Sequence, residues 1–158
     1  GFGNREDKMR APTLLALAAL LAVPASAEQS KAIDGNLETI SARYAECAAY
    51  FRLVHHALLA ANDAATASKY RQTEDTSMLY SLLAASEGRE RGVAVRVTNS
   101  RIEMYLKSMK NEVNNRNENI SILINKHGTE CIALVNTPPA EIERVVKERK
   151  DETKQKRR

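Results

Sequence analysis

The strongest constraint on the fold is a stripe of apolar residues that recurs at every third or fourth position. The stripe consists of Leu37, Ile40, Tyr44, Cys47, Phe51, Val54 and Leu58. This spacing places all of these side chains on one face of an α-helix, and that face leaves water only if other helices cover it. Asp34 or Asn36 can cap the start, and Asn62 and Asp63 mark the end, which predicts a helix over about 36–61.

Three later segments show the same helical spacing. The second begins at Asp63 and ends at Gly88, and the third begins at about Thr98 and ends in an asparagine-rich run. The fourth covers 120–135 and contains Gly128, which can kink it. Together with the first stripe, these segments provide four amphipathic helices joined by short connections.

The composition argues against a β-rich fold. The chain has only six glycines and four prolines, which are too few for the turns of a many-stranded sandwich or barrel. The stretch 93–97 alternates like a strand, but no second strand can pair with it, so we interpret it as a loop or the start of a helix. The sequence therefore predicts an all-α protein, an antiparallel four-helix bundle, to which residues 140–150 can add a short fifth helix.

Residues 9–27 have the three parts of a secretory signal peptide. Arg10 supplies a positive charge after Met9, an apolar run follows, and the small residues Ala25 and Ala27 form the pattern that precedes cleavage. The apolar run of 14 residues is shorter than the roughly 20 residues of a spanning helix. We therefore expect a periplasmic or secreted protein with no transmembrane anchor after cleavage.

The signal peptide divides the chain into four parts. Residues 1–8 are an upstream or non-native leader, 9–27 are the signal peptide, 28–146 form the helical bundle domain, and 147–158 form a charged disordered tail. The tail is assigned as disordered because it contains no apolar residue.

The basic charge of the chain lies at its C-terminal end. The formal net charge is +4, and residues 147–158 carry seven basic and three acidic residues, whereas 28–146 carry 14 basic and 15 acidic residues. Nucleic-acid binding needs a lysine and arginine face interleaved with stacking groups, and the tail has no aromatic residue, so no nucleic-acid partner is expected. We interpret the tail as solubilising, with weak attraction to an anionic membrane surface or wall polymer as the alternative.

The two cysteines lie on the apolar stripes of different helices. Cys47 belongs to the first stripe and Cys131 to the fourth, so both face the predicted core. An exported chain folds in a compartment where disulfides form, which predicts a bond between Cys47 and Cys131. This bond would tie the last helix of the bundle to the first.

A metal site is the alternative use of the cysteines. His127 and Cys131 are four residues apart and share one helix face, and Cys47 and His55 are two turns apart on the opposing helix. Thiolate and imidazole groups together suit copper(I) or zinc. Because a disulfide removes both thiolates, this site would require the reduced protein.

The chain lacks the sequence motifs of familiar catalytic sites. It contains no nucleophile elbow, zinc-protease motif, phosphate loop or dinucleotide fingerprint, so neither a cofactor nor enzymatic activity is expected. A concave pocket lined by Tyr44, Phe51 and Tyr105 would indicate a small-ligand binder. A continuous exposed apolar stripe on the second or third helix would instead indicate a structural or oligomer-forming protein.

Three stretches of the chain resemble a loose set of small exported proteins of proteobacteria. The similar stretches are 44–51, 119–123 and 126–131, which include both cysteines. Proteins of this set have a signal peptide, an all-helical mature part, one cysteine in the first helix and another near the end. The resemblance covers about 37–135. It implies a periplasmic address and a bundle, and it implies no catalytic residue and no ligand.

These features predict a periplasmic or secreted helical-bundle protein that acts as a binding or accessory module without enzymatic activity. Its expected partner is a protein or small-molecule ligand of the cell envelope. A copper- or zinc-binding envelope protein and a structural, homo-oligomeric envelope protein are the alternatives.

Overall fold

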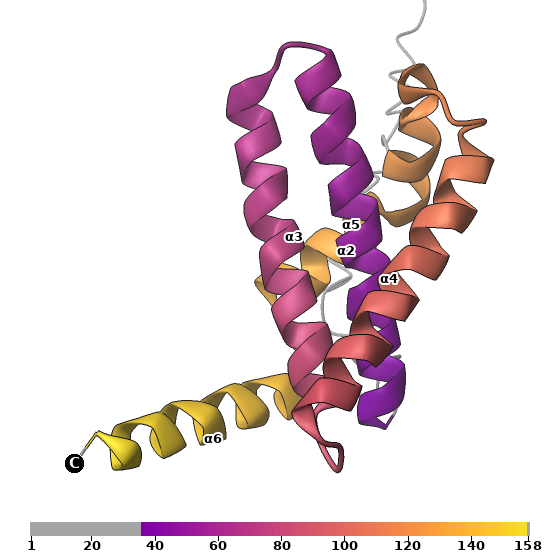
Figure 1. Ribbon diagram of the computed structural model, residues 1–158. Coiled ribbons are helices and arrows are strands. Elements are labelled where there is room, and N and C mark those ends of the chain that lie inside the picture. The colour runs from indigo at the N-terminus through magenta and orange to yellow at the C-terminus, as the bar shows by residue number, and fades with distance from the viewer. Residues whose placement is uncertain (1–35, 158) are drawn as a thin grey trace, which may run out of the picture.

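The computed structural model describes residues 36–157, and these residues form helices joined by short turns (Figure 1). The elements are α2 (Leu37–Ala60), α3 (Ala64–Ala85), α4 (Arg91–Glu112), the 3-10 turn η1 (Asn117–Asn119), α5 (Ser121–Asn136) and α6 (Ala140–Lys156). No strand occurs within the described range. The prediction of an all-α bundle with an additional C-terminal helix is therefore confirmed.

Two predicted segments fall outside the described residues. These are the leader at 1–8 and the signal peptide at 9–27. Within residues 36–157, no helix combines the length and the apolar character that crossing a membrane requires.

The helix α2 is the centre of the bundle. In Figure 1, α2 lies between α3 and α4, and the helices from α2 to α5 alternate in direction. The three largest fully buried side chains, Tyr44, Tyr50 and Phe51, all belong to α2. The predicted stripe is thus confirmed as a core face, and burial extends beyond it because neighbouring helices cover several sides of α2.

Small side chains line the contact between α2 and α3. The buried small residues of the two helices include Ser41, Ala45, Ala48 and Ala49 on α2 and Ser77, Ser81, Ala84 and Ala85 on α3. The hydroxyl of Ser41 donates to the carbonyl of Ser81 at 2.9 Å, and the hydroxyl of Ser81 donates to the carbonyl of Ser41 at 2.8 Å. Such reciprocal bonds satisfy buried polar groups and fix the relative position of the two helices.

The turn between α3 and α4 is held by a carboxylate with two guanidinium partners. Glu38, at the start of α2, accepts hydrogen bonds from Arg89 in the turn and from Arg101 in α4. Arg101 also donates to the hydroxyl of Ser41 at 2.9 Å. The hydrogen bonds from Arg89 and Arg101 lower the pKa of Glu38 to about 2.

The ion pairs of Glu38 should make stability depend on pH. A carboxyl group with a lowered folded-state pKa stabilises the fold above its unfolded-state pKa of about 4.5, and this contribution disappears as the pH falls towards 2. We expect Glu38→Gln to lower the Tm by about 2–4 °C at pH 7, because the pairs are only partly buried. Thermal unfolding should show this difference shrinking between pH 4.5 and pH 2, and a difference that persists at pH 2 would contradict the assignment.

The structure decides two local questions about the middle of the chain. The stretch 93–97 is the start of a helix, which was one of its two interpretations, whereas the prediction that the third helix begins near Thr98 is wrong because α4 begins at Arg91. The reason is that Ala94, Thr98 and Ile102 follow one another at helical steps of four and are all buried. The fourth segment is also continuous, since α5 runs through Gly128 without interruption.

The prediction of a disordered tail at 147–158 is wrong for most of that stretch. The helix α6 continues to Lys156, although its outer part buries no apolar residue. Lysine, arginine, glutamate and glutamine have high helix propensity, and pairs at helical spacing add to it. One such pair joins Arg144 to Glu148 at 2.9 Å.

Candidate functional site

A groove lies where α6 leaves the bundle beside α3. The first turns of α6 are anchored because Ile142 and Val145 are buried, and the rest of the helix extends away from the bundle (Figure 1). The space between the outer part of α6 and the C-terminal half of α3 has a volume of about 560 Å³. This volume lies within the range of small-molecule pockets.

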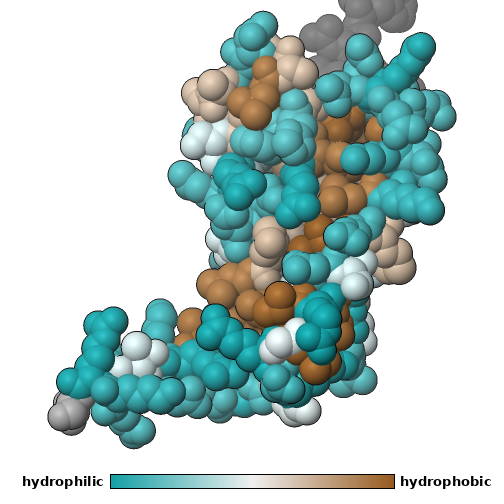
Figure 2. Space-filling view, viewed as in Figure 1, coloured by the Kyte–Doolittle hydropathy of each residue, from teal (hydrophilic) through white to brown (hydrophobic). Residues whose placement is uncertain are grey.

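The floor of the groove is apolar and comes mainly from α3. It consists of Leu79, Tyr80 and Leu83, with Val146 added from α6. Leu79 is 50% exposed, which is high for a large aliphatic side chain. Figure 2 shows hydrophobic surface gathered at the junction of α6 with the bundle and bordered by hydrophilic residues. An apolar surface that remains open to solvent in this way is a candidate contact for a partner.

The floor is connected rigidly to the core. The ring of Tyr80 packs edge-on against the ring of Tyr44, with the ring centroids 5.2 Å apart. The hydroxyl of Tyr44 donates to the carbonyl of Leu134 in α5 at 2.8 Å. The groove therefore rests on packed side chains rather than on a loop.

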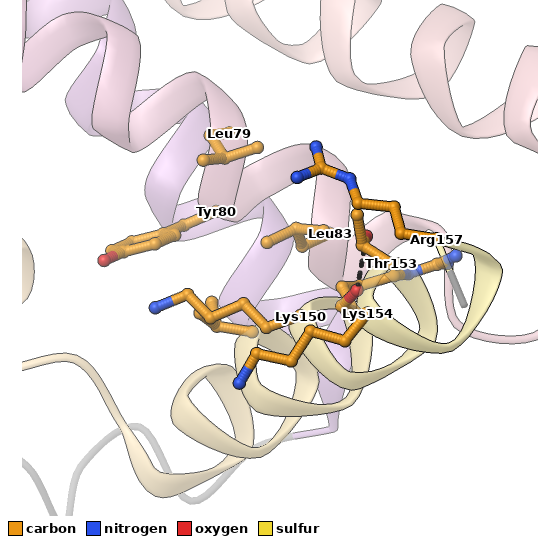
Figure 3. Close-up of a pocket in the computed structure, with 9 residues that line it drawn as sticks. Leu79, Tyr80, Leu83, Lys150, Thr153, Lys154 and Arg157 are labelled. Atoms are coloured by element: carbon orange, nitrogen blue, oxygen red, sulfur yellow. Dashed lines mark hydrogen bonds between the residues drawn. The ribbon is translucent and has the colours of Figure 1, made fainter.

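The wall of the groove is cationic and comes from α6. One stripe of α6 faces the groove and, with the C-cap residue Arg157, contains Val146, Arg149, Lys150, Thr153 and Lys154. The steps of three and four between these positions keep them on one side of the helix. Figure 3 shows Leu79, Tyr80 and Leu83 on one side of the groove and the labelled side chains of Lys150, Lys154 and Arg157 on the side of α6.

The acidic residues of α6 lie outside this stripe. Glu148, Asp151 and Glu152 do not line the groove, and none of its nine lining residues is acidic. Arg149 has an ion-pair partner, Glu152, at 3.5 Å. Lys150, Lys154 and Arg157 have none among residues 36–157. The outer part of α6 is thus segregated by charge, with its unpaired cations beside the apolar floor.

A second hollow continues the same surface on the other side of Arg149. It has a volume of about 450 Å³ and shares Leu79, Leu83 and Arg149 with the first. Its remaining lining residues are Leu82, Ser86, Arg89 and Arg91. Basic residues therefore line both hollows beside the exposed Leu79 and the half-buried Leu82 and Leu83.

The aromatic residues proposed from the sequence as a ligand pocket have other positions. Tyr44 and Phe51 are fully buried in the core. Tyr105 is half-buried on α4. Burial raises the pKa of its hydroxyl, and the negative charge of Glu46 raises this pKa further. None of the three lines the grooves described for residues 36–157. The structure therefore gives Tyr44 and Phe51 a packing role.

The disulfide predicted between Cys47 and Cys131 is present. It joins α2 to α5 with the two Cα atoms 5.3 Å apart, within the usual range for such bonds. Both residues are fully buried. The bond spans 84 positions of the sequence and links the first described helix to the fourth.

The histidines of the alternative metal site have other contacts. The Nδ1 atom of His127 lies 3.4 Å from a carboxylate oxygen of Glu46, and the Nδ1 atom of His55 lies 2.8 Å from the carbonyl oxygen of Ala67. Burial lowers the pKa of His127, and the negative charge of Glu46 opposes this shift. Residues 36–157 contain no cluster of three or more histidine, cysteine, aspartate or glutamate side chains that could hold a metal ion.

A polar network surrounds the disulfide. Arg43 forms ion pairs with Glu46 on its own helix and with Glu130 on α5. Gly128 lies against the ring of Tyr50, where a Cβ atom would approach the tyrosine hydroxyl to 3.0 Å. These contacts fix α5 against α2, and no cavity among the described grooves opens onto them.

One buried charge has no signal in the apolar pattern. Glu74 in α3 is fully buried, and its Oε1 atom accepts a hydrogen bond from the Nε atom of Arg52 at 2.6 Å. The guanidinium of Arg71 lies 3.6 Å from its other oxygen. The stretch 71–77 is polar and interrupts the apolar spacing of the second segment, but α3 continues through it because Arg52 of α2 compensates the carboxylate.

Comparison of the chain with protein-family models, with curated proteins and with solved structures finds no match. The resemblance to small exported helical proteins therefore stays a prediction. The fold and the groove define a disulfide-linked helical bundle with a cation-lined apolar groove, and a function must be inferred from that groove's own residues.

Proposed function

We propose that the protein is an exported, non-enzymatic binding protein whose ligand site is the groove between α3 and α6. The ligand carries both negative charge and apolar surface. The observation that supports this proposal is the placement of Lys150, Lys154 and Arg157, which have no ion-pair partner among residues 36–157, beside the exposed Leu79 and the half-buried Leu83 of α3.

This arrangement is unfavourable in the absence of a ligand. Lys150 and Lys154 are separated by four positions on one helix, and like charges at this spacing repel each other. Leu79 and Leu83 expose apolar surface in the same place. A ligand with an anionic group and an apolar body would relieve the repulsion and remove the leucines from water.

The proposed location outside the cytoplasm is supported by two independent features. The sequence at 9–27 has the pattern of a secretory signal peptide, and a buried disulfide is typical of proteins that fold in an oxidising compartment. The ligand is therefore expected among the proteins and small molecules of the cell envelope or its surroundings.

Titration with anilinonaphthalene sulfonate tests the groove directly, because this dye has an aromatic body and one negative charge. We expect its fluorescence to rise on binding to the oxidised protein. The variant Lys150→Glu/Lys154→Glu should weaken binding about tenfold, since two attractive charges become repulsive.

The control variant is Lys147→Glu/Lys156→Glu, which changes the net charge equally on the same helix but outside the groove. Circular dichroism should confirm that both variants keep the helical content of the wild type. Equal weakening in both variants, or no binding by the wild type, would contradict the proposed site.

A further inference from the structure

We propose that the ligand of the groove is an acidic amphipathic α-helix of another protein, bound alongside α6. This inference rests on the proposed function and specifies its partner. It is derived from the spacing of the cations, the form of the apolar floor and the charge of the wall.

The cations of α6 recur along a line rather than around a point. The stripe from Val146 to Arg157 spans eleven helical steps, or about 16 Å. Basic side chains occur on each successive turn, first at Arg149 and Lys150, then at Lys154, and last at Arg157. A small ligand with one anionic group could neutralise only one end of this line. A helix with acidic residues at every third or fourth position presents a carboxylate to each turn.

The floor of the groove suits the apolar face of a helix. Leu79 and Leu83 are four positions apart on α3 and so form adjacent contacts on one face. The second hollow extends this surface by Leu82. Helix-in-groove recognition uses apolar anchors at the same spacing, flanked by charges that pair with the rim. One partner helix can therefore place apolar residues on α3 and acidic residues on α6.

The same features argue against two other occupants. The α6 helix of a second copy carries acidic residues, among them Glu148, Asp151 and Glu152, but it has no apolar residue after Val146 to cover the leucines, which argues against two copies that pair through α6. An anionic membrane would attract the cations, but the stripe contains a single aliphatic side chain, Val146, and so cannot insert as an amphipathic helix does.

The test uses a capped synthetic peptide of about 18 residues, with leucines at helical spacing and glutamates along one side, and a scrambled peptide of identical composition. Fluorescence anisotropy with the full oxidised protein should show binding of the patterned peptide at least about tenfold tighter than the scrambled one. Binding should weaken about tenfold in Lys150→Glu/Lys154→Glu and remain unchanged in Lys147→Glu/Lys156→Glu. Circular dichroism of the mixture should show added helix as the peptide folds.

The outcomes separate this inference from the proposed function. If the dye binds in the groove but the two peptides bind equally, the helical partner is wrong and the groove remains a site for smaller anions. If neither the dye nor the patterned peptide binds, both proposals fail. Groove-dependent binding to phosphatidylglycerol vesicles without preference for the patterned peptide would overturn the inference in favour of a membrane surface. A dimer in sedimentation that the groove variant abolishes would overturn it in favour of a second copy.

Discussion

Replacement of both Cys47 and Cys131 by alanine is expected to lower the free energy of unfolding by about 3–5 kcal/mol. The bond spans 84 positions, so its removal restores much conformational freedom to the unfolded chain. It also removes two buried sulfurs that pack between α2 and α5. Urea unfolding followed by circular dichroism should show a large decrease in the midpoint.

The matched control for this experiment is the wild-type protein after reduction. Reduction should lower the unfolding midpoint in the same direction as the double substitution, and intact mass should increase by two hydrogens. An unchanged midpoint after verified reduction would contradict the stabilising role of the bond. Two free thiols in the protein purified without reductant would contradict the bond itself.

Substitution of Arg52 by leucine is expected to cost about 2–4 kcal/mol, because it leaves the carboxylate of Glu74 without its hydrogen-bond donor. Glu74 is 0% exposed, so water cannot replace the lost partner without opening the helix pair. Arg71 lies 3.6 Å from the carboxylate and compensates part of the charge, which places the cost below that of an isolated buried ion. Chemical unfolding measures the effect.

The double variant Arg52→Leu/Glu74→Leu separates the contribution of the ion pair to stability from the contribution of side-chain packing. Replacing both members of a buried pair by apolar residues of similar size is often close to neutral. We therefore expect the double variant to be more stable than Arg52→Leu alone. Arg71→Leu is the second control, and it should cost little because Arg71 is largely exposed. If the double variant is less stable than Arg52→Leu, the buried carboxylate of Glu74 does not destabilise the fold in the absence of Arg52, and the assignment is contradicted.

The sequence was sufficient for the features that depend on local spacing. The stripe from Leu37 to Leu58 repeats at helical steps without interruption, and α2 matches its predicted bounds within one residue at each end. The disulfide could also be predicted, since Cys47 and Cys131 lie on core-facing stripes and residues 9–27 match the pattern of an export signal. Neither inference required knowledge of how the helices cross.

The groove could not be predicted because it depends on the direction in which α6 leaves the bundle. Helical spacing alone places Arg149, Lys150 and Lys154 on one side of a helix, but it does not indicate which helix they face. The absence of apolar residues after Val146 indicated a disordered tail, whereas charged residues with high helix propensity continue α6 to Lys156. The separation of acidic from basic positions in 146–157 was the available signal.

The burial of the aromatic candidates and of Glu74 also could not be predicted from the sequence. Tyr44 and Phe51 are candidates for a ligand pocket from the sequence, but α2 is covered by several helices and these rings fill the core. Glu74 lies in a polar stretch whose burial depends on Arg52 of the neighbouring helix. Both outcomes are set by contacts between helices, which a single sequence does not specify.

Chemical-shift mapping tests the central claim, that the groove between α3 and α6 is the binding site, most directly. Anilinonaphthalene sulfonate would be titrated into the isotope-labelled, oxidised protein while backbone amide and leucine methyl signals are recorded. The groove account predicts that the largest shifts occur at Leu79, Leu83, Lys150 and Lys154. Shifts centred instead on the separate hollow beside Leu53 and Val113, with those of the α3 leucines unchanged, would contradict it.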